Sequence, residues 1–312
     1  YDMAYSYLAI YILGYLAVYL YLYFTAVLRS FGNSMFQAVA MLVSTILNAI
    51  LDPIFIHFIG FHGAAIATLL SQVICLAFMF IYLKKKKLFE FKISAFDKND
   101  VLTLIQKAIP SVIQQSIPAI STTFLTALVS TYSVTAIAAY GVTGKLETIL
   151  FYPAMALNMV LTTIIGQCVG GARYDRAKDY LKCALGYGCG LLVILSVLVV
   201  GFSKQLSGLF VKSDAVAAIV GTYFLIVSVG YILNTVTNCY LGALNGMGKP
   251  SKSMFLMIFY YIVVRMPLAY LLSYLGFGLN GIWVAVLVSH VVASVAAGIS
   301  GTIAIKKRTS TT

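Results

Sequence analysis

Four ionisable residues fall inside long apolar runs of this 312-residue sequence, and they are its first candidates for chemistry. They are Asp52, Lys145, Glu147 and Arg265. If the runs cross a membrane, a charge within them is costly, and such charges commonly mark ion or substrate pathways. Each of these charged residues is therefore a candidate either for binding a ligand or for a structural role.

Lys145 and Glu147 are two positions apart, so they do not face each other on a helix. Their depth depends on where their helix begins. A start near Thr135 puts both a few turns inside, where they could line a cavity, and a start near Thr143 leaves them at the outer rim. Both remain candidates for binding substrate or ion.

Asp52 and Arg265 stand beside prolines. Asp52 precedes Pro53, and Arg265 precedes Pro267 at the equivalent place later in the chain. Proline leaves the carbonyl about four residues earlier without its helical hydrogen bond. Asp52 could organise that break or bind a cation, and Arg265 could reach outward or pair with a carboxylate. We favour structural roles and keep Asp52, Pro53 and Arg265 as structural or coupling candidates.

Neutral polar and aromatic residues supply a larger set of candidates. Asn234 and Asn238 are four apart and share a helix face. Buried amides in lipid need partners, so these residues either bond helix to helix or form a polar wall that binds substrate. Other amides in the runs are Gln114, Gln115 and Asn158, and tyrosines that could stack on a flat cation are Tyr19, Tyr23, Tyr260 and Tyr261.

Patterns typical of enzymes and metal sites are absent from the sequence. There is no GxSxG, HExxH or Walker phosphate-binding pattern. His57 and His62 lie at the edges of runs, and His290, near the middle of one, suits a packed or lumen-facing position. The five cysteines show no CxxC spacing: Cys75, Cys168, Cys183, Cys189 and Cys239. We expect neither an enzyme nor a cofactor, metal site or disulfide framework.

Composition indicates that these residues are held by membrane-spanning helices. Hydrophobic residues make up 61% of the chain and charged residues 10%, against about 25% charged in a soluble domain. The mean hydropathy is +0.97. Many apolar runs exceed the length of about 18 residues that suggests a spanning helix, and they do not alternate as barrel strands do. We therefore predict an all-α integral membrane protein.

Nine spans are expected, with boundaries that can be read from the apolar runs. They cover about 5–28, 35–58, 62–83, 109–131, 137–168, 181–203, 215–243, 253–275 and 280–304. Of 21 Lys and Arg residues, 17 fall in one set of alternate loops, while Lys204 and Lys212 fall in the other. This bias predicts a cytoplasmic C-terminus and, with nine spans, an outer N-terminus. The net charge of +12 is spread between spans, so it does not suggest a nucleic-acid partner.

An internal repeat relates the two ends of the chain. At a shift of 216 residues, Tyr7, Ile10, Gly14, Tyr15, Leu28 and Gly32 fall on Tyr223, Ile226, Gly230, Tyr231, Leu244 and Gly248. Gly60 and Phe61 fall on Gly276 and Phe277, and a two-residue insertion places Ser71 on Ser289. The shift covers six spans, an even number, so the repeats run parallel, as in many transporters. The first copy has three spans, and we expect about 100 residues and three helices before Tyr1.

The predicted organisation follows from the repeat. Residues 1–83 form an incomplete N-terminal bundle of three helices, and 84–108 a basic cytoplasmic linker. Residues 109–304 form a six-helix C-terminal bundle, and 305–312 a cytoplasmic tail. The lysine run at 84–87 could bind anionic lipid, but we favour a topology determinant in a solvated linker.

Four stretches resemble a known family when taken in order. They are 47-LNAILDPIFIHFIGFHGAAIATLLSQ-72, 28-LRSFGNS-34, 162-TTIIGQCVGGARYDRAK-178 and 242-GALNGMGKPSKS-253. Together they are similar to helices and turns of the multidrug and toxic compound extrusion (MATE) family. The resemblance covers nearly the whole chain and makes its nine spans helices four to twelve of twelve. It implies two six-helix bundles around a central cavity.

The resemblance also implies an activity. Family members export cationic or amphipathic compounds as Na⁺ or H⁺ enters, by alternating access. Some use acids in the seventh and tenth helices, where this chain has Gln115, Asn234 and Asn238. Others use an acid in the first helix, outside this sequence. The coupling ion therefore stays open between Na⁺ and H⁺.

Rival functions make different demands on the sequence. A lipid-linked oligosaccharide or peptidoglycan-precursor flippase needs a strongly cationic cavity, but only Lys145 and Arg265 are available inside spans. A membrane-bound acyl or glycosyl transferase needs a loop rich in acids and histidines, which the short outer loops lack. A channel fits the repeat less well than a carrier. We expect a monomeric, multi-pass plasma-membrane antiporter that contacts lipid and small organic cations or amphipathic compounds.

Overall fold

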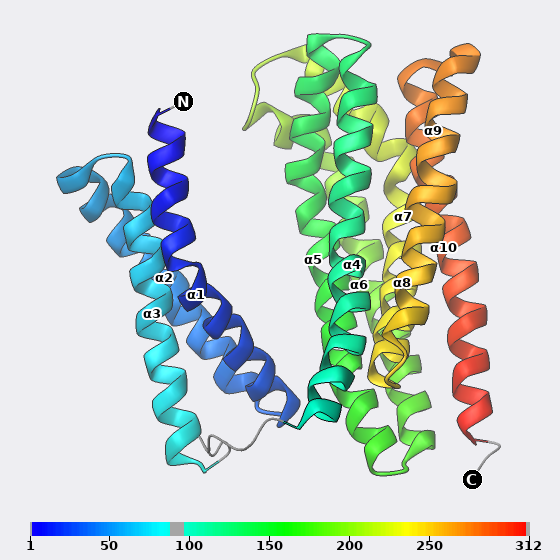
Figure 1. The fold of residues 1–312 in the computed structure, drawn as a ribbon. Helices are drawn as coiled ribbons and strands as arrows, with labels where there is room; N and C mark the ends of the chain where they lie inside the picture. Colours follow the sequence, from blue (N-terminus) through cyan, green and yellow to red (C-terminus); the bar gives the residue numbers. More distant parts are fainter. Residues whose placement is uncertain (1, 88–96, 310–312) are drawn as a thin grey trace. The chain divides into compact units, whose positions relative to one another are not determined.

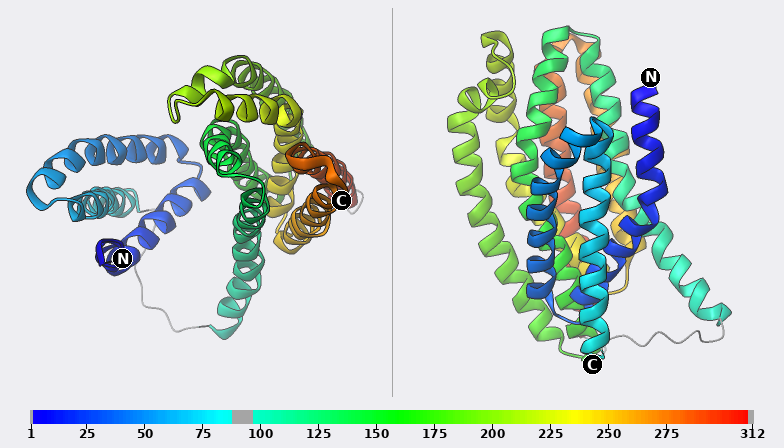
Figure 2. Two further views of the ribbon diagram at one scale, coloured as in Figure 1. Left: turned by 90° about the horizontal axis from the view of Figure 1, so that it is seen from above. Right: turned by 90° about the vertical axis from the view of Figure 1, so that its left-hand side faces the viewer.

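The computed structural model describes residues 2–87 and 97–309, and the chain divides into two compact units, Tyr1–Ala95 and Phe96–Thr312. Figure 1 shows that long helices build each unit. Within each unit successive long helices run up and down (Figure 1), as the right-hand view of Figure 2 also shows, and the left-hand view looks down on them from above. Each unit is described by itself below.

The Tyr1–Ala95 unit contains three helices. They are α1 (Asp2–Ser30), α2 (Ser34–Ile59) and α3 (His62–Lys85). Asn33 caps α2, because its side chain accepts the Phe36 amide hydrogen bond that the helix itself cannot satisfy. The α3 helix packs on both others. Its Gly63 allows close contact with α2, since a Cβ there would lie 2.2 Å from the Phe55 carbonyl oxygen.

The Phe96–Thr312 unit begins with four long helices. They are α4 (Lys98–Ser130), α5 (Val134–Gly170), α6 (Tyr174–Gly208) and α7 (Asp214–Gly246). Of the linker predicted over 84–108, residues 88–96 lie outside the described residues, and the helix expected from 109 begins earlier, at Lys98. Asp97 caps the helix there by accepting from the Asn99 amide, and the polar first turns extend it past the apolar run.

The unit ends with a helical hairpin. Its rising limb contains α8 (Pro250–Ile258), the π-helical segment η1 (Phe259–Arg265), α9 (Met266–Leu272) and the π-helical segment η2 (Ser273–Phe277). Gly276 and Gly278 turn the chain with φ values of +86° and +61°, a region that glycine enters without steric cost. The returning limb is α10 (Gly278–Thr309) (Figure 1).

The lengths and composition of these helices fit a membrane. Seven helices in the described part are long and apolar enough to cross one, and the last of them, Pro250–Lys306, holds both limbs of the hairpin. The α1 helix adds 29 residues. This confirms the prediction of an all-helical membrane fold with about nine spanning segments.

The repeat seen in the sequence reappears in backbone geometry. After α1, the Gly32 amide donates to the Arg29 carbonyl and the Asn33 amide to the Leu28 carbonyl. After α7, Gly248 donates to Asn245 and Lys249 to Leu244, at a shift of 216 residues. Both glycines have positive φ, +77° and +73°. This is the Schellman C-cap, in which a left-handed residue satisfies the last helical carbonyls.

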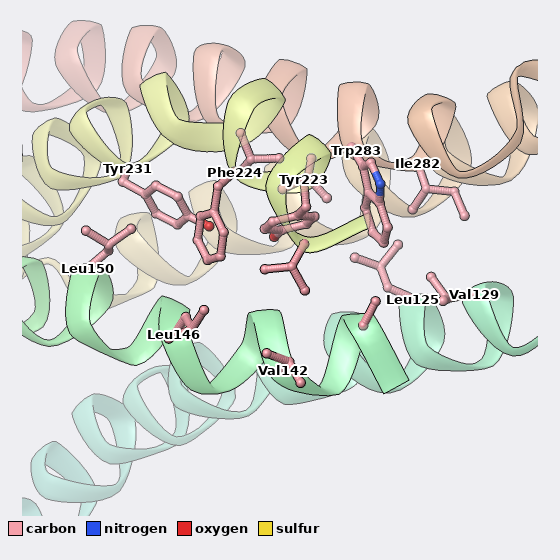
Figure 3. Close-up of a cluster of buried hydrophobic side chains, with 14 of the residues drawn as sticks. Leu125, Val129, Val142, Leu146, Leu150, Tyr223, Phe224, Tyr231, Ile282 and Trp283 are labelled. Atoms are coloured by element: carbon pink, nitrogen blue, oxygen red, sulfur yellow. The ribbon is translucent and has the colours of Figure 1, made fainter. Parts of the chain in front are cut away.

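The core of the larger unit forms where α7 contacts α5, α6 and α10. Its largest fully buried side chains include Trp283, Tyr223, Tyr231 and Phe224. Figure 3 shows Tyr223 and Tyr231 projecting from α7 toward α5, with their hydroxyl groups directed toward each other. The polar ends of both rings therefore lie inside an otherwise apolar core.

Candidate functional site

A carboxylate lies between α5 and α7 in the larger unit. Because α5 begins at Val134, Glu147 sits about 20 Å along the helix, which resolves its depth in favour of the inner position. Tyr231 Oη donates a hydrogen bond to Glu147 Oε1 at 2.7 Å, and Tyr223 Oη donates to the same oxygen. The two tyrosines are eight residues apart and so share one face of α7.

A buried guanidinium lies between η1 and α10. Arg265 is 6% exposed. Its Nε donates to Ser289 Oγ at 2.8 Å, its Nη2 lies 3.2 Å from His290 Nε2, and its Cζ stands 4.4 Å from the centre of the Tyr261 ring. Arg265 is buried and does not reach outward, and it forms no direct ion pair among the described residues. Neutral partners hold the charge instead.

The contact with Arg265 fixes the protonation of His290. Arginine can only donate hydrogen bonds, so His290 Nε2 must accept and the neutral ring carries its proton on Nδ1. That Nδ1 atom is buried and has no partner among the described residues. Gly230 lets the ring approach α7, since a Cβ there would lie 2.9 Å from His290 Cδ2. His290 is therefore packed, as the sequence suggested.

The carboxylate and the guanidinium belong to one group of side chains. The Tyr231 and His290 ring centres are 6.5 Å apart, and Phe151 contacts both rings. Arg265 and Glu147 interact electrostatically. We call Glu147, Tyr223, Tyr231, Arg265, Ser289 and His290 the charge cluster. It joins α5, α7, η1 and α10, and its arginine is the last residue of the π-helical segment η1, an irregularity that is frequent at functional sites.

A chain of amides links α5 and α7 further along the helices. Asn158 Nδ2 donates to Asn238 Oδ1 at 3.3 Å, and Asn238 Nδ2 donates to the Asn234 carbonyl oxygen at 3.0 Å. Gly242 permits this approach, because a Cβ there would lie 2.5 Å from the Asn158 carbonyl oxygen. The Asn158–Asn238 bond thus joins α5 to α7, whereas the Asn238–Asn234 bond stays within α7. Asn234 Nδ2 is buried and has no partner among the described residues.

The remaining candidates of the larger unit are scattered. Lys145 and Gln115 are exposed, whereas Gln114 is buried. Tyr260 is only 2% exposed and packs 4.2 Å from Tyr261, ring centre to ring centre, so its face is covered. The structure therefore does not bring Lys145, Gln115 and Tyr260 together with Glu147.

The smaller unit has its own polar contacts between α2 and α3. Asn48 Nδ2 donates to Asp52 Oδ1 at 3.1 Å and to Thr68 Oγ1 at 3.3 Å. Asp52 thus has an amide partner one turn away on its own helix, next to Pro53. Tyr19 and Tyr23 are both exposed in this unit. Among the described residues no group of three His, Cys, Asp or Glu side chains could hold a metal ion.

Sequence reasoning missed the partners that define the charge cluster. Tyr223, Tyr231 and Ser289 served only as markers of the repeat. A signal was present, because a spacing of eight residues puts both tyrosine hydroxyls on one face of an apolar helix, where each needs a partner. The sequence did not indicate that this partner is Glu147.

Comparison with known proteins identifies the family to which this architecture belongs. The helices, their repeated turns and their buried polar residues define a multi-pass helical membrane protein. The MatE family model matches residues 110–271, more than half of the chain. The chain therefore belongs to the MatE family.

The chain is also similar to individual transporters and to a solved structure. The chain is 32% identical over 153 residues to a probable multidrug resistance protein NorM of Pasteurella multocida, covering 47% of this chain and 33% of that protein. It is 26% identical over 280 residues to a FAD transporter of Shewanella oneidensis, covering 86% and 61%. A crystal structure of MATE in complex with MaL6 matches with a TM-score of 0.91 and 22% identity, covering 97% and 70%, and shows the shared fold. The chain thus spans less than two thirds of these two curated relatives.

Proposed function

We propose that the chain forms the greater part of a secondary active antiporter. It exports cationic or amphipathic small molecules in exchange for Na⁺ or H⁺, and it works by alternating access. Membership of the MatE family and the names of the multidrug relatives support this proposal. A ligand can drive such a cycle only if it binds one orientation better than the other, so the protein needs a residue where the entering cation binds.

The observation that carries the proposal is the placement of Glu147. It is a carboxylate inside a membrane-spanning helix, only partly exposed, and held by two tyrosine hydroxyls. Both hydroxyls donate to Oε1, so the second oxygen remains available to an entering cation. A residue that is this costly to keep in a membrane is a strong candidate for ion coupling.

The flippase alternative receives less support. A pyrophosphate needs several converging cations. Of the two cations within spans of the larger unit, Lys145 is exposed and Arg265 is committed to Ser289, His290 and Tyr261. The proposed antiporter is a multi-pass monomer of the plasma membrane with a cytoplasmic C-terminus. It contacts lipid and small organic substrates.

Transport by the complete gene product tests the function. The gene is expressed in an efflux-deficient host, and ethidium retention is measured with an imposed Na⁺ or H⁺ gradient. A broad panel of cationic dyes and FAD follows, because one relative is a FAD transporter. Export that depends on one gradient is the expected result. Absence of gradient-dependent export across the whole panel contradicts the proposal.

A further inference from the structure

Glu147 and Arg265 differ from the other charged residues of the larger unit whose burial the structure describes. They are the two described Asp, Glu, Lys or Arg residues of this unit that lie away from helix ends without being exposed. They carry opposite charges and are joined through two side chains: Tyr231 donates to Glu147, His290 accepts from Arg265, and the two rings lie 6.5 Å apart, centre to centre. A single unpaired charge in such a place is strongly destabilising, whereas two opposite charges offset each other.

The two charges differ in how firmly they are committed. Arg265 is 6% exposed and is held by a serine, a neutral histidine and an aromatic ring. A guanidinium does not lose its proton in a protein, so this charge is permanent. Glu147 is partly exposed and its partners are tyrosine hydroxyls, which leave the carboxylate able to accept a cation. One charge is fixed and the other can be neutralised.

We infer that Arg265 is the resident counter-charge of Glu147, and that it makes the binding of a coupling cation exclude an organic cation. The inference rests on the proposed antiport. When no coupling cation is bound, the negative charge of Glu147 cancels the positive charge of Arg265. The charge cluster is then neutral and tolerates a cationic substrate nearby. With a cation on Glu147 the cluster carries one positive charge, which repels a second cation through a medium of low dielectric constant. Antiport requires this mutual exclusion.

The cluster leaves few other groups that could take the counter-charge role. Facing Glu147 from α7 are Tyr223 and Tyr231, which are neutral donors. From η1 come Tyr261 and Arg265, and from α10 comes His290, which the contact with arginine keeps neutral. Tyr140, on the same helix as Glu147, stacks on Trp283. Arg265 is thus the permanent positive charge among these groups.

A double-mutant cycle tests the pairing without any transport assay. The complete gene product is purified as wild type, Arg265→Gln, Glu147→Gln and the double variant, and the apparent Tm of each is measured. We expect Arg265→Gln to lower the Tm by about 10 °C and the double variant to recover most of that loss. Arg265→Lys, which keeps the charge, should retain most of the stability. The matched control Arg176→Gln, at an exposed position, should leave the Tm within about 2 °C of wild type.

Equal losses on removing Arg265 in the wild-type and Glu147→Gln backgrounds would overturn the pairing, because a purely structural arginine gives additive effects. If Arg265→Gln alone does not accumulate, the yield of the double variant decides. Recovery of folded protein supports the pairing, and failure to recover overturns it. These results do not depend on efflux, so they remain distinct from a failure of the proposed function.

Exclusion has a separate readout, the affinity of the purified protein for ethidium at varied pH and Na⁺ concentration. In the wild type, acid or Na⁺ should weaken binding at least about tenfold. The neutral double variant should bind ethidium equally well under all conditions, and Glu147→Gln should bind it weakly throughout. Wild-type affinity that is insensitive to both pH and Na⁺ would overturn the exclusion.

Discussion

The segments α1–α3 and α7–α10 share a repeat but not a polar interior. Their first helices end in the same Schellman turn, and each first helix has a glycine, Gly14 or Gly230, pressed against the last helix of its segment. Gly14 packs against Leu69, whereas Gly230 packs against His290. Backbone turns and helix contacts have thus been kept while the buried chemistry has diverged. The repeat explains the architecture, and the departures from it locate the candidate site.

We expect the largest difference in stability between the two segments when Gly14 and Gly230 are replaced by alanine. In Gly230→Ala the new methyl group would lie 2.9 Å from the His290 ring, which cannot move without losing Arg265. We expect a loss of about 3 kcal/mol, at the upper end for overpacking. In Gly14→Ala the neighbour is the flexible end of Leu69, and the loss should be about 1 kcal/mol. Thermal unfolding of the two purified variants measures the difference, and a larger loss for Gly14→Ala would contradict it.

The repeated serines form a second matched pair. Ser289 Oγ accepts from Arg265 Nε while donating to the Val286 carbonyl, whereas Ser71 Oγ donates to the Thr68 carbonyl. Ser289→Ala should cost about 2 kcal/mol, because hydrogen bonds to charged groups are strong. Ser71→Ala should cost about 0.5 kcal/mol. The comparison is made by thermal unfolding, and equal losses would show that the arginine does not depend on Ser289.

The repeated turns should respond alike. Gly32→Ala and Gly248→Ala each force alanine into the left-handed region, so each should cost about 1 kcal/mol. Ala172 occupies the corresponding place after α5 with a φ of +55°, and the Ala172→Gly variant should gain about 1 kcal/mol. Unfolding of the three variants measures these shifts. A gain on replacing either glycine would show that the turns are not equivalent.

The sequence predicted the spans well because apolar length is a local property. Residues 35–58 were predicted as a span and α2 covers Ser34–Ile59. The start of α4 was missed because residues 98–108 are polar enough to leave the membrane and still remain helical. Glu147 was recognised as a candidate, but its partners Tyr223 and Tyr231 lie more than 70 residues away. Such partners depend on how α5 and α7 pack, which no local pattern encodes.

Coupled transport by Glu147→Gln tests the central claim most directly. The complete protein is reconstituted in liposomes, and ethidium export is measured with and without a cation gradient, beside Asp179→Asn, an exposed acidic residue on α6. We predict that Glu147→Gln, which binds ethidium weakly, exchanges it only slowly across the bilayer and without responding to the gradient, while Asp179→Asn responds as the wild type does. Gradient-driven export by Glu147→Gln at the wild-type rate would contradict the account.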